Sequence, residues 1–285
     1  MTIRSLPAAN IAVRPGLRSE VSPHVLDRWN SSIRAAGKED EENTISIMEP
    51  IGADWMGDGV TAKRISGALR AIGKKDVTVS INSPGGDYFE GLAIYNLLRE
   101  HPAKVTVKIV GIAASAASVI AMAADEVQIA RAGFLMIHNT WVFAMGDRNE
   151  LRNVADWLEP FDLAAVDIYA ARTGIDPKEL VKMLDRETWI GGADAVDRGF
   201  ADTLLSADEI DSKAKNSIEG KVVVASHKIE TLLARAGVSK SERRELLAAM
   251  KGGMSSAAST GMSGAAVLSG VEDLLSSIKA ISSNA

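Results

Sequence analysis

Residues 105–118 read Val-Thr-Val-Lys-Ile-Val-Gly-Ile-Ala-Ala-Ser-Ala-Ala-Ser, and this stretch decides the fold. Its first part, residues 105–110, is rich in β-branched side chains, a composition that favours a strand. Its second part consists mostly of small residues and predicts a buried helix that begins near Ser115. A strand that leads directly into a helix is the building unit of an α/β protein.

The same unit repeats along the chain. Strands alternate with helices in the expected pattern, which implies right-handed crossover connections and a mostly parallel sheet. The predicted strands cover residues 44–48, 77–81, 105–110, 127–130 and 134–137. The predicted helices cover residues 60–72, 89–98, 147–172 and 193–198, with a further helix starting at Asp176 and Pro177. The sequence therefore predicts an α/β architecture.

The pattern divides the chain into three regions. Residues 44–205 are expected to form the α/β domain. Residues 1–43 lack a sustained apolar period, so we expect an N-terminal arm with a short helix near 25–36, and this arm is a candidate pro-segment removed by self-cleavage. Residues 206–285 are expected to form a C-terminal extension. In it, a Gly/Ser/Ala-rich linker at 252–264 precedes a terminal helix with apolar residues at helical spacing.

Composition narrows the functional class. The 285 residues are 46% hydrophobic, enough for a substantial core, and their net charge of −5 argues against a nucleic-acid-binding protein. The absence of cysteine excludes disulfides, thiolate nucleophiles and cysteine-bound metals. Residues 1–20 lack the apolar run of an export signal, and the longest apolar stretch, residues 109–124, is too short for a membrane span. We expect a cytoplasmic protein that needs no metal or cofactor.

Three features point to a chemical function. Ser115 lies where a strand meets a helix, His138 ends the apolar run 134–137, and Gly85-Gly86 forms a turn that can expose backbone N–H groups. These are the parts needed for nucleophilic attack on a carbonyl group with stabilisation of the oxyanion. A purely structural role is the alternative, because a small serine side chain at the start of a helix also allows close packing. The ordinary pKa of histidine, however, makes His138 a suitable base for Ser115.

The sequence leaves the third member of such a site open. A carboxylate usually fixes the tautomer of the imidazole and stabilises its charge. Asp185 and Glu187, on either side of Arg186, are the candidates. The same three residues also fit a solvated helix end with an exposed ion pair.

Five sequence blocks, in order and spacing, resemble the ClpP peptidases, the proteolytic subunits of the caseinolytic protease family. The blocks are Asn82-Ser83-Pro84-Gly85-Gly86, Gly91-Leu92-Ala93-Ile94-Tyr95, Gly111 to Ser115, Met136-Ile137-His138, and Arg186-Glu187-Thr188-Trp189 followed by Ala193 to Gly199. The resemblance covers about residues 44 to 205. It implies a spiral ββα fold of the ClpP/crotonase type, with a protruding handle helix from Asp147 and the activity of a serine endopeptidase.

The resemblance also implies catalytic roles. Ser115 would be the nucleophile, His138 the general base and Glu187 the orienting acid. Glu187 is one methylene longer than the family's aspartate, so Asp185 stays the alternative acid.

By the same resemblance, the N–H groups of Gly86 and Ala116 would form the oxyanion hole, with Gly85 beside them at the substrate. The handle helix would join two rings of subunits face to face, and Arg186 would lie at that contact. The implied assembly is a homo-oligomeric chamber that encloses a polypeptide substrate.

Several departures from the family pattern, together with extensions at both ends, resemble the ClpP-related head-maturation proteases of bacteriophages and prophages. These departures are Ile112, Ala116-Ala117, Asn139 and Glu187-Thr188-Trp189. A head-maturation protease would cleave scaffold or capsid precursors. The alternative is a degradative subunit that receives its substrates from an AAA+ unfoldase.

Other functional classes stay open. Crotonase-type acyl-CoA enzymes share the fold and bind an oxyanion without a serine nucleophile. A serine–lysine dyad would need a lysine near Ser115 and no role for His138. A non-catalytic assembly protein would keep only a vestigial site.

Overall fold

The strand expected in residues 105–110 is observed as β4 (Val105–Ala114), which lies inside a seven-stranded sheet. The computed structural model describes residues 18–19, 21–33, 42–52 and 59–205, with a few positions between 229 and 248. The predicted linker at 252–264 and the terminal helix after it lie outside these residues, as do residues 1–17 of the predicted arm.

The sheet is mostly parallel, as the alternation of elements predicts. Its other strands are β2 (Thr44–Ile47), β3 (Val77–Ser83), β5 (Glu126–Ile129), β6 (Phe134–Ile137), β8 (Thr188–Gly191) and β9 (Thr203–Leu204). β4 pairs with β5 along residues 106–109 and with β6 along residues 112–114, so it changes partner at Gly111. β8 joins β6 in antiparallel orientation. This change of partner carries β6 to the end of β4, where Ser115 follows.

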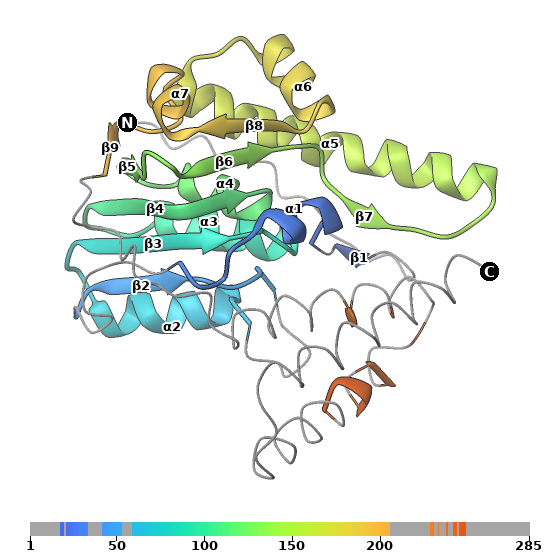
Figure 1. Cartoon of the computed structure of the whole chain (residues 1–285), viewed down its shortest axis with the longest axis horizontal. Helices are drawn as coiled ribbons and strands as arrows, with labels where there is room; N and C mark the ends of the chain where they lie inside the picture. The colour runs from blue at the N-terminus through green and yellow to red at the C-terminus, as the bar shows by residue number, and fades with distance from the viewer. Residues whose placement is uncertain are drawn as a thin grey trace.

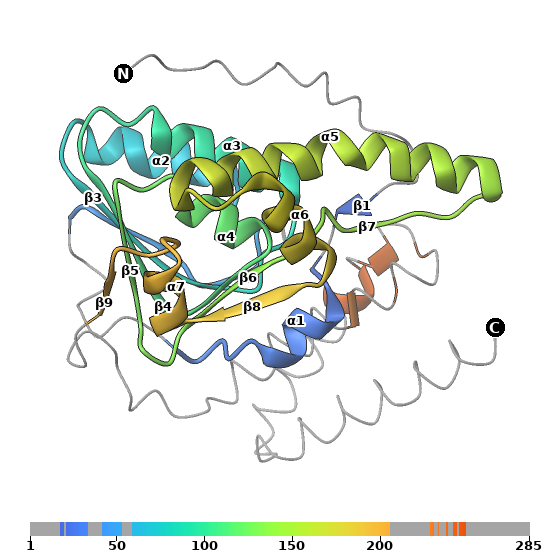
Figure 2. The same ribbon diagram turned by 90° about the horizontal axis from the view of Figure 1, so that it is seen from above.

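Helices cover both faces of the sheet (Figures 1 and 2). They are α1 (Pro23–Arg28), α2 (Ala62–Ile72), α3 (Tyr88–Arg99), α4 (Ala116–Ala121), α5 (Arg148–Thr173), α6 (Pro177–Asp185) and α7 (Gly192–Asp197). Figure 2 shows α2, α3, α4 and α5 on one face and α1 on the other. α5 extends beyond the body of the domain beside a small ribbon of β1 (Arg18–Ser19) and β7 (Val142–Phe143). The expected handle helix is therefore present.

Local sequence accounts for the bounds of the handle. The Asp147 side chain accepts hydrogen bonds from the N–H groups of Asn149 and Glu150, and the Glu150 carboxylate accepts one from Asp147 N, which completes a capping box. Gly174, with φ 73°, ends the helix in the left-handed conformation that favours glycine. Pro160 lies within the helix, which continues to Thr173.

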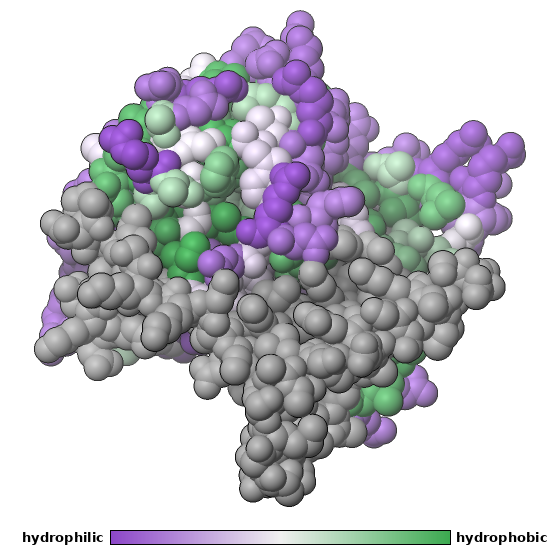
Figure 3. Space-filling view, viewed as in Figure 1, coloured by the Kyte–Doolittle hydropathy of each residue, from purple (hydrophilic) through white to green (hydrophobic). Residues whose placement is uncertain are grey.

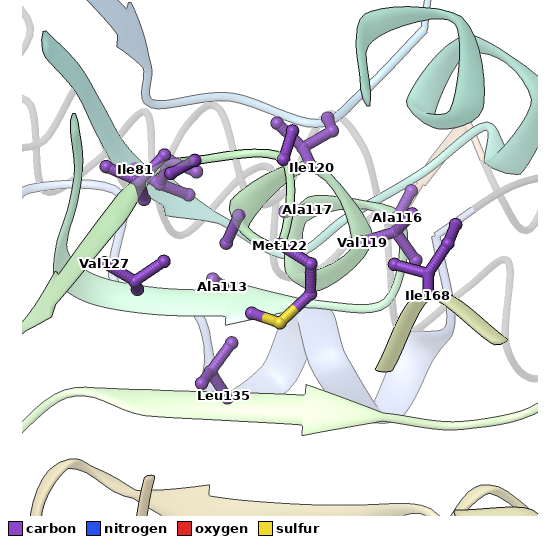
Figure 4. Packing of buried hydrophobic residues seen from close by; sticks show 14 of the residues in the cluster. Ile81, Ala113, Ala116, Ala117, Val119, Ile120, Met122, Val127, Leu135 and Ile168 are labelled. Atoms are coloured by element: carbon purple, nitrogen blue, oxygen red, sulfur yellow. The ribbon is translucent and has the colours of Figure 1, made fainter. Parts of the chain in front are cut away.

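The core contains the whole of α4. All six residues of α4 are buried, and Figure 4 shows them surrounded by side chains from the sheet and from α5. A Cβ atom placed on Gly91 of α3 would lie 2.9 Å from the Cβ of Ala116, so a glycine there lets the two helices touch. The small side chains of the 113–118 stretch thus allow the helix after Ser115 to sink into the core.

The structure corrects three details of the sequence interpretation. β4 continues to Ala114 rather than ending at 110, because its last residues gain β6 as a partner. The short helix of the predicted arm covers Pro23–Arg28 rather than 25–36. β8 was not anticipated, because Thr188–Gly191 is too short to show a strand period and depends on pairing with β6.

Asn82 binds the segment 21–33, part of the predicted arm, to the sheet through hydrogen bonds. The fully buried Asn82 side chain donates to the carbonyl oxygens of Asn30 (2.8 Å) and Ile33 (3.2 Å) and accepts from Ile112 N (3.1 Å). The Trp29 indole N–H donates to the Asn82 carbonyl oxygen at 3.0 Å. One amide therefore links the segment to both β3 and β4.

Replacing Asn82 by alanine should destabilise the protein by about 2–4 kcal/mol, since the buried N–H of Ile112 and the carbonyl oxygens of Asn30 and Ile33 lose their partner. Urea unfolding followed by circular dichroism measures the change. Asn30→Ala is the matched control, because Asn82 binds only the backbone carbonyl of Asn30. Equal unfolding midpoints for the two variants would contradict the proposed role of Asn82.

Candidate active site

Ser115 occupies a constrained turn between β4 and α4. Its φ of 55° and ψ of −125° are uncommon for a residue with a side chain. Hydrogen bonds hold the turn on both sides: Ser115 N donates to the carbonyl oxygen of Met136 at 2.9 Å, and the Ser118 hydroxyl donates to the carbonyl oxygen of Ser115 at 2.6 Å. The turn thereby directs the Ser115 hydroxyl away from the core and towards the end of β6.

His138 meets that hydroxyl. It follows β6 directly, and its Nε2 lies 2.7 Å from Ser115 Oγ. At this distance the serine O–H can donate to the unprotonated ring nitrogen, the arrangement required for general-base activation. The structure brings together the two residues that the sequence indicated, although 23 positions separate them.

Burial lowers the pKa of His138 below its ordinary value, because the charged imidazolium loses its hydration. The negative charge of Glu187 acts in the opposite direction and is the smaller effect. The ring is therefore neutral, and able to accept a proton, at neutral pH.

Glu187 is the acid placed beside His138. In the antiparallel pairing of β6 with β8, Ile137 lies opposite Thr188, so the next residues outward are His138 and Glu187. Glu187 has a φ of 49°, and its Oε1 accepts a hydrogen bond of 3.1 Å from the indole N–H of Trp189. The alternative acid, Asp185, instead accepts a hydrogen bond of 2.9 Å from the amide of Asn139.

Neither carboxylate is hydrogen-bonded to His138 within the part of the chain that the structure describes. Glu187 nevertheless acts on the imidazole through its charge, whereas Asp185 is bound elsewhere. Trp189, which sequence reasoning did not single out as a site residue, holds one oxygen of the longer acid. No pattern in the sequence indicated this role, because it depends on the pairing of β8 with β6, and Thr188–Gly191 is too short to show a strand period.

Gly85 approaches the Ser115 turn, and Gly86 approaches Ile51, more closely than any larger residue can. Their φ values are 83° and 146°. A Cβ atom on Gly85 would lie 2.7 Å from the Ser115 Cβ, and one on Gly86 would collide with the carbonyl oxygen of Ile51. Both positions therefore require glycine.

The backbone N–H groups of Gly86, which lines a pocket together with Ser115, and of Ala116, the residue after Ser115, are the candidates for binding an oxyanion. Gly85 N donates to the Ser83 hydroxyl at 3.2 Å, and the neighbouring bridge to Ile51 uses the carbonyl of Gly85 and the N–H of Asp87. Among the described residues, the N–H groups of Gly86 and Ala116 make no hydrogen bond. Unpaired donors at this position suit an oxyanion.

A pocket borders these groups, lined by Gly86, Ser115 and His138 together with aromatic and small side chains. The described residues that line it include no lysine, so the structure offers no partner for a serine–lysine dyad there. No group of three or more His, Cys, Asp or Glu residues that could hold a metal occurs in the described part of the chain. Arg186 lies apart from the pocket, exposed at the end of α6, where it contacts the Lys182 carbonyl and Glu179.

The comparison of the sequence with known protein families agrees with this site. Residues 31–208 match the Clp protease family. The chain belongs to the Clp protease family. It is thus a serine-type peptidase with the mixed α/β fold of that family.

Individual relatives of the chain are also named as Clp protease subunits. The chain is 30% identical over 137 residues to the "ATP-dependent Clp protease proteolytic subunit 3" of Rhodococcus jostii, a match that covers 47% of this chain and 67% of the relative. It is 33% identical over 130 residues to the "ATP-dependent Clp protease proteolytic subunit 2" of Treponema denticola, covering 44% and 64%. The matches thus span about two thirds of each relative. In the described residues no helix is both long and apolar enough to cross a membrane.

The pH dependence of peptide hydrolysis should report the state of His138. Because burial lowers the pKa of His138, kcat/KM should stay constant from neutral pH down past about 6.5 and then fall as the imidazole gains a proton. Glu187→Gln removes the charge that raises this pKa, so the fall should move to lower pH while kcat drops at least about tenfold.

Asp185→Asn is the matched control, since it neutralises the acid that is bound to Asn139. A shift of the acid limb in Asp185→Asn, with none in Glu187→Gln, would reverse the assignment of the acid.

Proposed function

We propose that this chain is an endopeptidase that cleaves peptide bonds through Ser115, His138 and Glu187. The observation that supports it most strongly is the 2.7 Å contact of Ser115 Oγ with His138 Nε2. Ser115 Oγ attacks the peptide carbonyl carbon while its proton passes to His138 Nε2. The C–N bond then breaks as His138 returns that proton to the leaving amine, and water repeats the sequence to release the acyl group.

The N–H groups of Gly86 and Ala116 stabilise the tetrahedral intermediate in this scheme. Neither makes a hydrogen bond to another described residue, and the close approach of the glycine turn holds one of them in place. A donor fixed before the reaction lowers the barrier because it needs no reorganisation, and loss of one such donor typically slows catalysis by ~10²–10³. Gly85 adjoins Gly86 where the substrate backbone would lie.

Glu187 orients His138 and stabilises its positive charge during catalysis. The pairing of β6 with β8 places it beside the imidazole, and the Trp189 indole holds one carboxylate oxygen. This fixed geometry accounts for a glutamate where the family resemblance leads us to expect the shorter aspartate.

We further propose that the subunits assemble into a chamber through α5. The segment that protrudes from the domain carries exposed apolar side chains, including Met145 and Leu151, and Figure 3 shows apolar surface in this region. Burial of such surface favours association. Arg186, exposed at the end of α6, is the charged residue that we place at the contact between rings.

Two biological settings fit this peptidase. The names of its relatives describe proteolytic subunits of ATP-dependent Clp proteases, which favours a degradative chamber served by an AAA+ unfoldase. The departures at Ile112, Ala116-Ala117, Asn139 and Glu187 favour a head-maturation protease that acts on capsid or scaffold precursors. In the first setting, hydrolysis of folded proteins requires ATP and a partner; in the second, access to the chamber depends on capsid assembly.

A fluorophosphonate probe should label Ser115 covalently, since the proton of its hydroxyl can pass to His138. Mass spectrometry of digested protein identifies the modified residue. Ser115→Ala should abolish labelling, and His138→Ala should slow it by about 10² or more.

Ser80→Ala is the control, because Ser80 is a buried serine of β3 that lies opposite Lys108 and is not part of the Ser115 turn. It should still be labelled at Ser115. Absence of labelling, or labelling that survives Ser115→Ala, would favour an assembly protein or an enzyme of the acyl-CoA class over a peptidase.

A further inference from the structure

Helix α1, which belongs to the predicted N-terminal arm, packs against the strands that carry the catalytic residues. Figure 2 shows α1 next to β8, on the face of the sheet opposite α4. Its buried side chains form one apolar cluster with Ala114, Met136 and the partly buried Trp189. Ala114 directly precedes Ser115, and Met136 lies two positions before His138. The segment 21–29 contributes Val21, Val25, Leu26 and Trp29 to this cluster.

One charged residue of α1 reaches β8, the strand that follows the proposed acid. The guanidinium of Arg28, the last residue of α1, lies over the Trp189 ring, 4.6 Å from its centroid. This distance is well within the range of a cation–π interaction. The indole N–H of the same ring donates to Glu187 Oε1 at 3.1 Å. Arg28, Trp189 and Glu187 therefore form a chain of contacts that leads from α1 to the acid beside His138.

The carboxylate of Glu187 depends on the orientation of the Trp189 ring. Glu187 precedes β8 instead of lying within it, and among the described residues the Trp189 indole is the hydrogen-bond donor to its carboxylate. Apolar contacts have no preferred direction, whereas a cation is attracted to the face of an aromatic ring. Arg28 therefore selects one orientation of an indole that the apolar cluster alone leaves free to turn. Its charge also strengthens the indole N–H as a donor, because neighbouring polar groups polarise one another.

Building on the proposed peptidase function, we propose that Arg28 is a positioning residue of the active site, which holds the Trp189 indole, and through it the Glu187 carboxylate, beside His138. Arg28 does not line the pocket at Ser115, so its effect on the nucleophile passes through the acid. The segment that contains α1 is then part of the catalytic unit. A pro-segment removed by self-cleavage would have to end before Arg28.

The rate at which the fluorophosphonate probe labels Ser115 tests this proposal on the full-length protein. Arg28→Met removes the charge of an exposed side chain and should slow labelling about two- to fivefold, the effect expected from loss of one exposed cation–π interaction. Arg28→Lys keeps the charge and should label faster than Arg28→Met. Arg131→Met is the matched control, because it removes an exposed arginine at the end of β6 away from His138. Equal rates for Arg28→Met and Arg131→Met would overturn the proposal.

Double variants separate positioning of the acid from a general structural effect. Arg28→Met should slow Glu187→Ala no further, because that variant has no carboxylate left to position. It should likewise add nothing to Trp189→Phe, which lacks the indole N–H. A further two- to fivefold loss in both double variants would show that Arg28 acts on Ser115 by another route and would contradict the assignment.

The mass of the labelled protein provides an independent test. Because the acid depends on Arg28, the chain that carries the probe should retain that residue whether or not the arm is processed. Mass spectrometry of the intact labelled chain locates its N-terminus. A chain that begins after residue 28 and is labelled at the full rate would overturn the proposal.

Labelling of the wild type distinguishes the two levels of failure. If the probe labels Ser115 and Arg28→Met labels as fast as the wild type, the positioning proposal fails and the peptidase function stands. If the probe does not label Ser115 in the wild type, the peptidase function fails and the positioning proposal fails with it.

Discussion

The contact between the Ser115 hydroxyl and the His138 imidazole depends on one strand pairing, that of β4 with β6. The parallel register from Ile112 to Ala114 places Met136 beside the turn, where its carbonyl accepts the N–H of Ser115. His138, two residues further along, then lies within 2.7 Å of the hydroxyl. Because backbone hydrogen bonds set this register, the distance between the two side chains is fixed by the sheet rather than by loops.

A second constraint is the packing of backbone against backbone around the same turn. Gly85 and Gly86 touch Ser115 and Ile51 where a Cβ atom has no room, and α4 consists of small buried residues. In the proposed mechanism, these close contacts hold the N–H groups of Gly86 and Ala116 beside the serine. Glycine costs backbone entropy at such positions, and we interpret its presence there as the requirement of two preorganised donors.

Much of this arrangement could be predicted from the sequence, because it rests on local patterns. The change from β-branched residues in 105–110 to small residues in 111–118 predicts the strand and the buried helix. The long helix from Asp147 is also predicted, and the family resemblance implies that it is the handle. The position of Glu187 could not be predicted in this way. It depends on β8, a four-residue strand that exists only through its pairing with β6. The residues that line the pocket could not be predicted either, since Tyr88, Trp141 and Tyr169 come together only through tertiary packing beside the site.

A crystal structure of the protein with a peptide boronic acid tests the central claim most directly. The account predicts a covalent bond between boron and Ser115 Oγ, with His138 still beside it. One boronate oxygen should lie about 2.7–3.1 Å from the N–H groups of both Gly86 and Ala116. A boronate whose oxygens all face solvent, or one bonded to another residue, would contradict the account.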